Sequence, residues 1–240
     1  MIFTFLSYSG KVGKTSLTAQ FQSMYYPTLV IKAVESINLT AAKFGCEVDT
    51  ITGDDFGGWF DSALDTEDGI IDIGASNIEN FLIGMVGYKR SHKIIDRYIV
   101  PTVNGEIEKE ETIRTINKLH GIGIPSDSIF IIPNKVVKNP EKEFKELFNY
   151  ANIEKRCTIT KDAVVYKNDL FDLLSTEGIT IRKVLDDKTD YEQMLKDSRG
   201  RDMSERQGIV SRLKMQMLAE SVVENLSKVF DVIGATGNGR

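Results

Sequence analysis

The feature that most constrains this chain is a glycine-bearing turn near its start, between an apolar run and a helical pattern. The run Ile2–Leu6 is apolar, and the residues from Leu17 onward can continue as a helix. Between them lies the segment Tyr8-Ser9-Gly10-Lys11-Val12-Gly13-Lys14-Thr15-Ser16. Backbone N–H groups in such a turn attract phosphate oxygens, and the positive end of the helix dipole adds to this attraction. The order of strand, turn and helix therefore predicts a phosphate-binding loop.

The loop departs from the full Gly-x-x-x-x-Gly-Lys-[Ser/Thr] pattern, because Tyr8 stands where the first glycine belongs. An ordinary strand-to-helix turn that contains Gly-Lys-Thr is the alternative interpretation. The flanking strand and helix favour a nucleotide loop. We expect Lys14 to reach the β- and γ-phosphates and the Thr15 hydroxyl to bind Mg²⁺. The expected nucleotide-binding residues of the loop are Ser9, Gly10, Lys11, Val12, Gly13, Lys14, Thr15 and Ser16.

The charge balance argues against a protein that binds nucleic acid with its whole surface. The chain has 240 residues and a formal net charge of −5, so any DNA contact requires a local basic patch. The segment from Lys196 to Lys214 is the best candidate, and Arg199, Arg201 and Arg206 are its expected DNA contacts. A solvated loop and helix face is the alternative, because three acidic residues interrupt the patch. These are Asp197, Asp202 and Glu205.

Cysteine and histidine usage favours a reduced environment without a histidine metal site. Cys46 and Cys157 lie far apart and lack metal-ligand spacing, and the only histidines are His92 and His120. The sequence contains no pattern of a signal peptide and no apolar run that could span a membrane. We therefore expect a cytoplasmic protein that does not contact a membrane.

Apolar, β-branched runs alternate with helical patterns through most of the chain. Several runs are nearly continuous in hydrophobicity, which is typical of parallel strands buried on both faces. The expected strands are Ile2–Leu6, Thr28–Val34, Gly69–Ile73, Tyr98–Val103, Ser128–Ile132 and Cys157–Thr160. The expected helices are Thr15–Met24, Leu39–Phe44, Ile78–Val86, Lys109–His120 and Pro140–Ala151. This alternation predicts one α/β domain over residues 1–240, with a doubly wound, mostly parallel sheet flanked by helices.

The C-terminal part carries one long helical pattern, over residues 203–233. Ser204 and Gln207 have the spacing of a capping box at its start. Apolar residues recur at helical spacing from Ile209 to Phe230. We expect this helix to pack on the domain or on a partner.

A second constellation follows the strand Gly69–Ile73. Asp72 lies near the carboxyl end of this strand and Gly74 follows two residues later. Asp72 is placed to hold Mg²⁺ directly or through water, and the Gly74 N–H to approach a γ-phosphate. An aspartate that caps the next helix is the alternative.

Glu35 follows the second strand, at an edge of the sheet where it could lie beside the phosphate loop. There it would orient the attacking water or bind the metal through water, so we count it with Lys14 and Asp72 as a catalytic candidate. The alternative is an acid that precedes a helix and interacts only with the helix dipole.

The segment Pro133-Asn134-Lys135-Val136-Val137 is related to the Asn-Lys-x-Asp signal with which GTPases read guanine. Val137 occupies the position of the aspartate that pairs with the N–H groups of guanine, so ATP is the favoured nucleotide. Asn134 could still contact adenine, and its alternative role is that of a turn residue after a strand.

Together these segments resemble the ParA/MinD superfamily of deviant Walker ATPases, and within it the StbB-type plasmid-stability proteins. The resemblance is carried by the segments 9–15, 34–38 and 72–79 and extends over residues 1 to about 155. It implies an ATPase that uses Mg²⁺ and whose nucleotide state controls association with itself and with partners. It also implies a nucleotide-dependent homodimer, a DNA-binding partner protein and a role in plasmid maintenance, DNA positioning or conjugation.

One departure from that family leaves the mechanism open. The family has a lysine five positions before the loop lysine, which reaches the phosphates of the other subunit, and Ser9 occupies this position here. Hydrolysis could therefore be slow, depend on a partner or be absent, as in a nucleotide-binding adaptor. A metabolic P-loop enzyme, such as a small-molecule kinase or ligase, is a further alternative. Trp59 and Phe60 would then line its substrate pocket.

Overall fold

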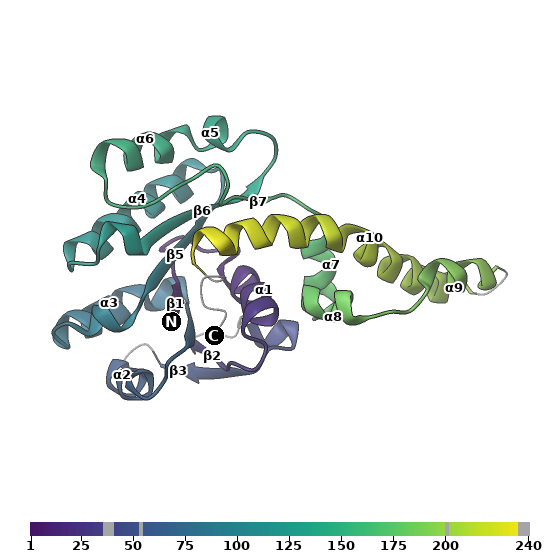
Figure 1. The fold of residues 1–240 in the computed structure, drawn as a ribbon, viewed down its shortest axis with the longest axis horizontal. Coiled ribbons are helices and arrows are strands. Elements are labelled where there is room, and N and C mark those ends of the chain that lie inside the picture. The colour runs from purple at the N-terminus through teal and green to yellow at the C-terminus, as the bar shows by residue number, and fades with distance from the viewer. Residues whose placement is uncertain (36–40, 53–54, 200–201, 235–240) are drawn as a thin grey trace.

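The computed structural model describes residues 1–35, 41–52, 55–199 and 202–234 (Figure 1). Within these ranges, seven strands form one sheet in the order β3-β2-β4-β1-β5-β6-β7. All of the pairings between these strands are parallel. The strands are β1 Ile2–Phe5, β2 Ile31–Val34, β3 Val48–Ile51, β4 Gly69–Ile73, β5 Arg97–Thr102, β6 Ile129–Val136 and β7 Val165–Tyr166. The expected doubly wound α/β class is confirmed.

Helices connect the strands and continue beyond the last one. The α-helices are α1 Lys14–Tyr25, α2 Phe56–Leu64, α3 Ile78–Gly87, α4 Glu106–Gly121, α5 Pro140–Glu143, α6 Lys145–Glu154, α7 Leu170–Glu177, α8 Ile181–Asp186, α9 Tyr191–Asp197 and α10 Met203–Val232. Short 3₁₀ segments are η1 Ala41–Phe44, η2 Ala75–Asn77, η3 Ser91–Ile94 and η4 Ser126–Ser128.

The helices cover both faces of the sheet and give the molecule two apolar cores (Figure 1). On one face, Phe21 of α1 contacts Phe3 of β1 and Phe230 of α10, with ring centroids 4.8 and 4.9 Å apart. Helices α7 and α8 complete this core. On the other face, the second core is formed by α2, α3, α4 and α6. They pack on the strand residues that point away from the first core, such as Ile2 of β1. Burial on both faces explains why the strands are nearly continuous in hydrophobicity.

The long C-terminal helix is confirmed as α10, which begins at Met203 as predicted, but its N-cap residue is Asp202 and not Ser204. The Asp202 carboxylate accepts a hydrogen bond from the backbone N–H of Ser204 at 3.3 Å, so the helix begins before Ser204. The expected capping box of Ser204 and Gln207 is therefore wrong. The C-terminal half of α10 packs on the sheet layer, and its N-terminal half extends away beside α9 (Figure 1).

Three strand predictions need correction. Cys157–Thr160 is no strand, because only Thr158 forms an isolated bridge, to Phe130, and the last strand is β7. The strand expected at Thr28–Val34 begins at Ile31. The strand expected at Ser128–Ile132 instead runs from Ile129 to Val136.

Other elements were predicted in part or missed. Residues 39 and 40 of the expected helix Leu39–Phe44 lie outside the described residues, and Ala41–Phe44 is a 3₁₀ segment. The expected helix Pro140–Ala151 is divided at Phe144 into α5 and α6. Strand β3 and helix α2 were not predicted, because β3 is an exposed edge with polar residues and α2 contains two glycines. Within the described ranges, no helix has the length and apolar character needed to cross a bilayer.

Candidate functional site

The phosphate loop leaves the sheet at the carboxyl end of β1, between β4 and β5. Phe5, the last residue of β1, is in register with Asp72 of β4. Carboxyl ends of neighbouring strands are where doubly wound sheets bind ligands. The topology therefore brings the two sequence motifs together at one edge of the sheet.

The loop backbone adopts the conformation that a phosphate cradle needs. Lys11 and Gly13 have φ angles of 59° and 90°, in the left-handed region. A Cβ atom on Gly13 would also overlap the Asn134 side-chain amide, so glycine is required there for two reasons. No described side chain caps the N-terminus of α1. The N-cap residue is Gly13, which has no side chain to cap the helix, and a helix N-terminus of this kind attracts anions.

Lys14 is held inside the loop. Its Nζ donates hydrogen bonds to the backbone oxygens of Ser7 and Ser9, at 3.3 and 3.2 Å. Burial lowers the pKa of the amine, and the nearby Asp72 and Glu35 carboxylates partly offset this effect. The lysine is thus positioned by neutral carbonyl groups that a phosphate can replace.

Asp72 is the most informative side chain of the site, because one of its oxygens has no partner. The residue is only 5% exposed, and among the described residues its Oδ1 has no hydrogen-bond partner. Burial raises its pKa to about 6, although a hydrogen bond from Thr15 and the charge of Lys14 lower it. A buried, unpartnered carboxylate oxygen beside a threonine hydroxyl fits Mg²⁺, which prefers oxygen ligands and keeps several waters.

Binding of Mg²⁺ at this site does not require that every ligand come from the protein. Among the described residues, no group of three or more His, Cys, Asp or Glu side chains could hold a metal ion. Thr15 and Asp72 would therefore hold Mg²⁺ together with phosphate oxygens and water, as is usual for this ion.

Glu35 and Gly74 face each other across the ends of β2 and β4. The Gly74 N–H donates to the Val34 carbonyl at 2.9 Å, and a Cβ atom on Gly74 would overlap the Glu35 carboxylate. The Asn77 amide lies 3.4 Å from Glu35 Oε1. The structure thus brings Glu35 next to Gly74 and close to Lys14. The adjoining residues 36–38 of the matching segment lie outside the described residues.

Asn134 lies within β6, so its alternative role as a turn residue after the strand is wrong. Its side chain is buried, and Nδ2 donates to the Val12 carbonyl at 2.8 Å. Its Oδ1 accepts from the Lys135 N–H, also at 2.8 Å. Asn134 therefore ties the phosphate loop to β6. A contact with adenine stays a prediction.

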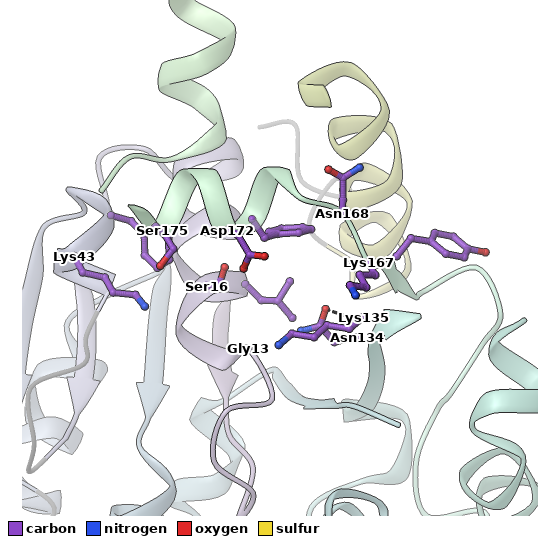
Figure 2. A pocket seen from close by; sticks show the side chains of 13 residues that line it. Gly13, Ser16, Lys43, Asn134, Lys135, Lys167, Asn168, Asp172 and Ser175 are labelled. Carbon is purple, nitrogen blue, oxygen red and sulfur yellow. Dashed lines mark hydrogen bonds between the residues drawn. The ribbon is translucent and has the colours of Figure 1, made fainter. Parts of the chain in front are cut away.

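A cavity of about 210 Å³ adjoins the loop at Gly13 and Ser16 (Figure 2). Gly13, Ser16 and Leu17 of the loop and α1 form one wall. The other walls come from η1, β6 and the segment from β7 to α7. Their lining side chains are Lys43, Phe44, Asn134, Lys135, Tyr166, Lys167, Asn168, Phe171, Asp172 and Ser175. The position of the cavity, continuous with the start of α1, suits the nucleoside of a bound nucleotide.

Most residues of this cavity could not be found from the sequence. Six of them, between Tyr166 and Ser175, belong to the C-terminal third, where no motif marks them and only the fold brings them to the site. Phe171 and Asp172 are examples, because they lie in the first turn of α7, whose sequence is that of an ordinary amphipathic helix. Trp59, by contrast, is 1% exposed in the core under α2, so it lines no loop mouth.

The remaining predicted loop residues are placed as follows. Gly10 and Lys11 are exposed at the loop apex, whereas Val12 is buried. Ser9 is buried, and its hydroxyl donates to the Gly10 carbonyl at 3.2 Å. Ser9 therefore supplies no charge at the position of the family lysine.

Two of the arginines expected to contact DNA lie at α9 and the start of α10, apart from α1 (Figure 1). Arg199 is exposed just after α9, and Arg206 is half-buried in the first turns of α10. Arg201 lies outside the described residues.

The sheet order, the loop after β1 and the open N-terminus of α1 define the class of P-loop NTPase folds. No protein-family model matches the chain, and no curated protein matches it in sequence.

Solved structures of the MinD type share this fold. The MinC:MinD cell division complex of Aquifex aeolicus is 15% identical, with a TM-score of 0.55, covering 90% of this chain and 95% of that one. MinD of Pyrococcus horikoshii complexed with Mg-ADP is 14% identical, with a TM-score of 0.51 and coverage of 92% and 95%. A single-residue variant of Cyanothece McdA in complex with ATP is 12% identical, with a TM-score of 0.51 and coverage of 94% and 96%. At these identities, the similarity shows a MinD/ParA-type fold.

Proposed function

We propose that this chain is a Mg²⁺-dependent ATPase that acts as a nucleotide-controlled switch. The observation that carries the proposal is the unpartnered Oδ1 of buried Asp72, next to the Thr15 hydroxyl and the loop lysine. A buried carboxylate oxygen without a hydrogen-bond partner is costly, and a cation bound beside the Thr15 hydroxyl would satisfy it. The described site offers positive charge for phosphates and oxygen ligands for a divalent cation.

Each residue has a distinct part in the proposed reaction. The α1 N-terminus and Lys14 bind the phosphates, and Thr15 and Asp72 hold Mg²⁺, which neutralises charge on the β- and γ-phosphates. The Gly74 N–H exchanges its bond to Val34 for one to the γ-phosphate. Glu35 orients the attacking water or contacts the metal through water. The nucleoside occupies the cavity bounded by α7.

The comparisons support ATP as the ligand at the level of the fold. MinD of Pyrococcus horikoshii was solved with Mg-ADP and McdA of Cyanothece with ATP. MinD of Aquifex aeolicus is found in complex with MinC. For this chain we propose a similar arrangement, in which a homodimer or a partner recognises the ATP-bound state.

The finer assignment is plasmid stability, partition or conjugation, together with a DNA-binding partner protein. The sequence resemblance to StbB-type proteins motivates it. Direct DNA contact through Arg199, Arg201 and Arg206 would be electrostatic. DNA affinity that stays constant between low and moderate salt would contradict such a contact.

Isothermal titration of ATP with Mg²⁺ tests the proposal. Wild-type protein should bind ATP, and Lys14→Ala should lose binding while circular dichroism shows an intact fold. Lys142→Ala, on the exposed surface of α5, is the matched control and should bind as the wild type does. Wild-type affinity in Lys14→Ala would overturn the proposal.

A nucleotide-binding adaptor without turnover is the second candidate, and Ser9 favours it. Ser9 is buried and neutral at the position where the family places a lysine. Release of inorganic phosphate separates the candidates. Turnover that rises on addition of DNA or partner supports the ATPase, whereas ATP binding with no phosphate release supports the adaptor.

A further inference from the structure

Tyr8 opens the phosphate loop, and its side chain leads away from the phosphates toward α3 and α4. Its hydroxyl donates a hydrogen bond to Glu79 Oε2 of α3. Its backbone N–H donates to the Thr115 hydroxyl of α4 at 3.3 Å. The guanidinium of Arg114 lies 4.4 Å from the centre of its ring. Tyr8 thus joins the loop to two helices on the same face of the sheet (Figure 1).

Glu79 is the centre of this network and has a second partner. The Lys118 ammonium of α4 contacts Glu79 Oε1 at 2.9 Å. The hydrogen bond from Tyr8, followed by that from Lys118, lowers the pKa of Glu79. Burial and the neighbouring Glu79 raise the pKa of Tyr8. At neutral pH the tyrosine is therefore the donor and the glutamate is an ionised acceptor, which is a strong type of hydrogen bond.

Glu79 is connected by a short stretch of chain to Gly74, the residue that would face the γ-phosphate in the proposed function. After Gly74, the chain forms η2 and passes into α3 at Ile78 with no intervening residue. The Asn77 N–H bonds back to the Gly74 carbonyl at 3.0 Å. Glu79 is the second residue of α3, so a displacement of Gly74 is transmitted to it over little more than one helical turn.

We propose that Tyr8 is a positioning residue, which holds the first turn of α3 against the phosphate loop and thereby lowers the affinity of the site for ATP relative to ADP. The inference rests on the proposed function. The Gly74 N–H must release the Val34 carbonyl before it can bind a γ-phosphate. The junction of η2 and α3 moves with Gly74 because the Asn77 N–H is bonded to the Gly74 carbonyl. The hydrogen bond between Tyr8 and Glu79 resists that movement. ADP has no γ-phosphate and does not require the movement.

The hydroxyl therefore weakens ATP binding relative to ADP binding. Tyr8→Phe removes the hydroxyl but keeps the ring under Arg114 and the backbone bond to Thr115. Loss of one partly exposed, charge-assisted bond should tighten ATP relative to ADP by about fivefold. A role in folding alone would change the affinities of both nucleotides by the same factor.

The test measures dissociation constants for ATP and ADP, each with Mg²⁺, by isothermal titration. Wild type is compared with Tyr8→Phe, Glu79→Gln and the double variant, and thermal melts confirm that each is folded. Tyr150→Phe is the matched control, because it removes a tyrosine hydroxyl that bonds Asn117 at 2.7 Å on the other side of α4 from α3. Its ratio of ATP to ADP affinity should equal that of the wild type.

Both single variants should shift the ratio toward ATP, Glu79→Gln by less because its amide oxygen still accepts from Tyr8, and the double variant should shift it no further than Tyr8→Phe. An unchanged ratio in Tyr8→Phe, with nucleotide still bound, would overturn this inference and leave the proposed function intact. If Tyr8→Phe does not fold, Glu79→Gln, whose side chain is partly exposed, should shift the ratio in the same direction by a smaller factor, and an unchanged ratio there would overturn the inference. Failure of the wild type to bind ATP would overturn the proposed function and this inference together.

Discussion

Replacement of Asp72 by asparagine should make the protein more stable and abolish its metal-dependent chemistry. The pKa of Asp72 is raised to about 6, from 3.8 for an unperturbed carboxyl, chiefly by burial. A difference of this size means that ionisation costs the folded state about 3 kcal/mol at neutral pH. Asparagine carries no charge, but its buried N–H₂ group costs about 1 kcal/mol where it lacks a partner. The net gain is then about 2 kcal/mol, or about 4 to 8 °C in Tm for a chain of this length.

The gain should depend on pH with a defined sign. Because the folded-state pKa is raised, the folded protein binds a proton more readily than the unfolded chain does. The cost of the ionised carboxylate is present above pH 6 and is relieved as the pH falls from about 6 to about 4. Asp72→Asn should therefore exceed the wild type in stability at pH 8, and this excess should shrink toward pH 4.

Urea denaturation at several pH values measures this difference, and titration with ATP and Mg²⁺ measures the loss of function. The hydrogen bonds of Lys14 go to Ser7 and Ser9, so the substitution does not strip the lysine of its partners. A lower free energy of unfolding in Asp72→Asn at pH 8 would refute the reasoning. An excess that does not change with pH would also refute it.

Three further outcomes follow from the same geometry. Binding of Mg²⁺·ATP needs an ionised Asp72, so the Kd of Mg²⁺·ATP should rise as the pH falls below about 6. A Kd that stays constant between pH 8 and 5 in calorimetry would contradict this. Gly13→Ala should weaken ATP binding more than tenfold, because its φ of 90° disfavours alanine and the Asn134 amide occupies the position of the added Cβ atom. A tenfold loss of affinity corresponds to roughly 1.4 kcal/mol. Gly208→Ala on α10 has open space and should bind ATP normally. Asn134→Ala should lower the free energy of unfolding by about 2 kcal/mol, because the buried Val12 carbonyl and the partly buried Lys135 N–H lose their partner. A loss below about 0.5 kcal/mol in denaturant titration would be too small for these two bonds.

The central part of the fold could be predicted because its strands have a simple physical signature. Strands such as β1 and β4 are buried on both faces, so their sequences are continuously apolar. The edge strand β3 has an exposed, polar middle and gave no such signal. The false strand Cys157–Thr160 has the right composition, but only Thr158 reaches β6. Pairing with a neighbour, which the local sequence does not encode, decides such cases.

The phosphate side of the site could be predicted, whereas the nucleoside side could not. Gly13 and Lys14 lie at the end of the loop that follows β1, and Asp72 lies near the end of β4, so parallel topology brings them to one edge. The cavity beyond Gly13 depends on how α7 packs beside α1, and Asp172 carries no local mark of this position. The bond of Tyr8 to Glu79 likewise joins residues 71 positions apart through tertiary packing.

The measurement that tests the account most directly is the mass of the protein in solution in different nucleotide states. Gel filtration with light scattering compares the protein with ATP·Mg²⁺, with ADP·Mg²⁺ and without nucleotide. A nucleotide-controlled switch predicts a dimer with ATP alone and a monomer in the other two states. The same mass in all three states would contradict a switch that acts through self-association.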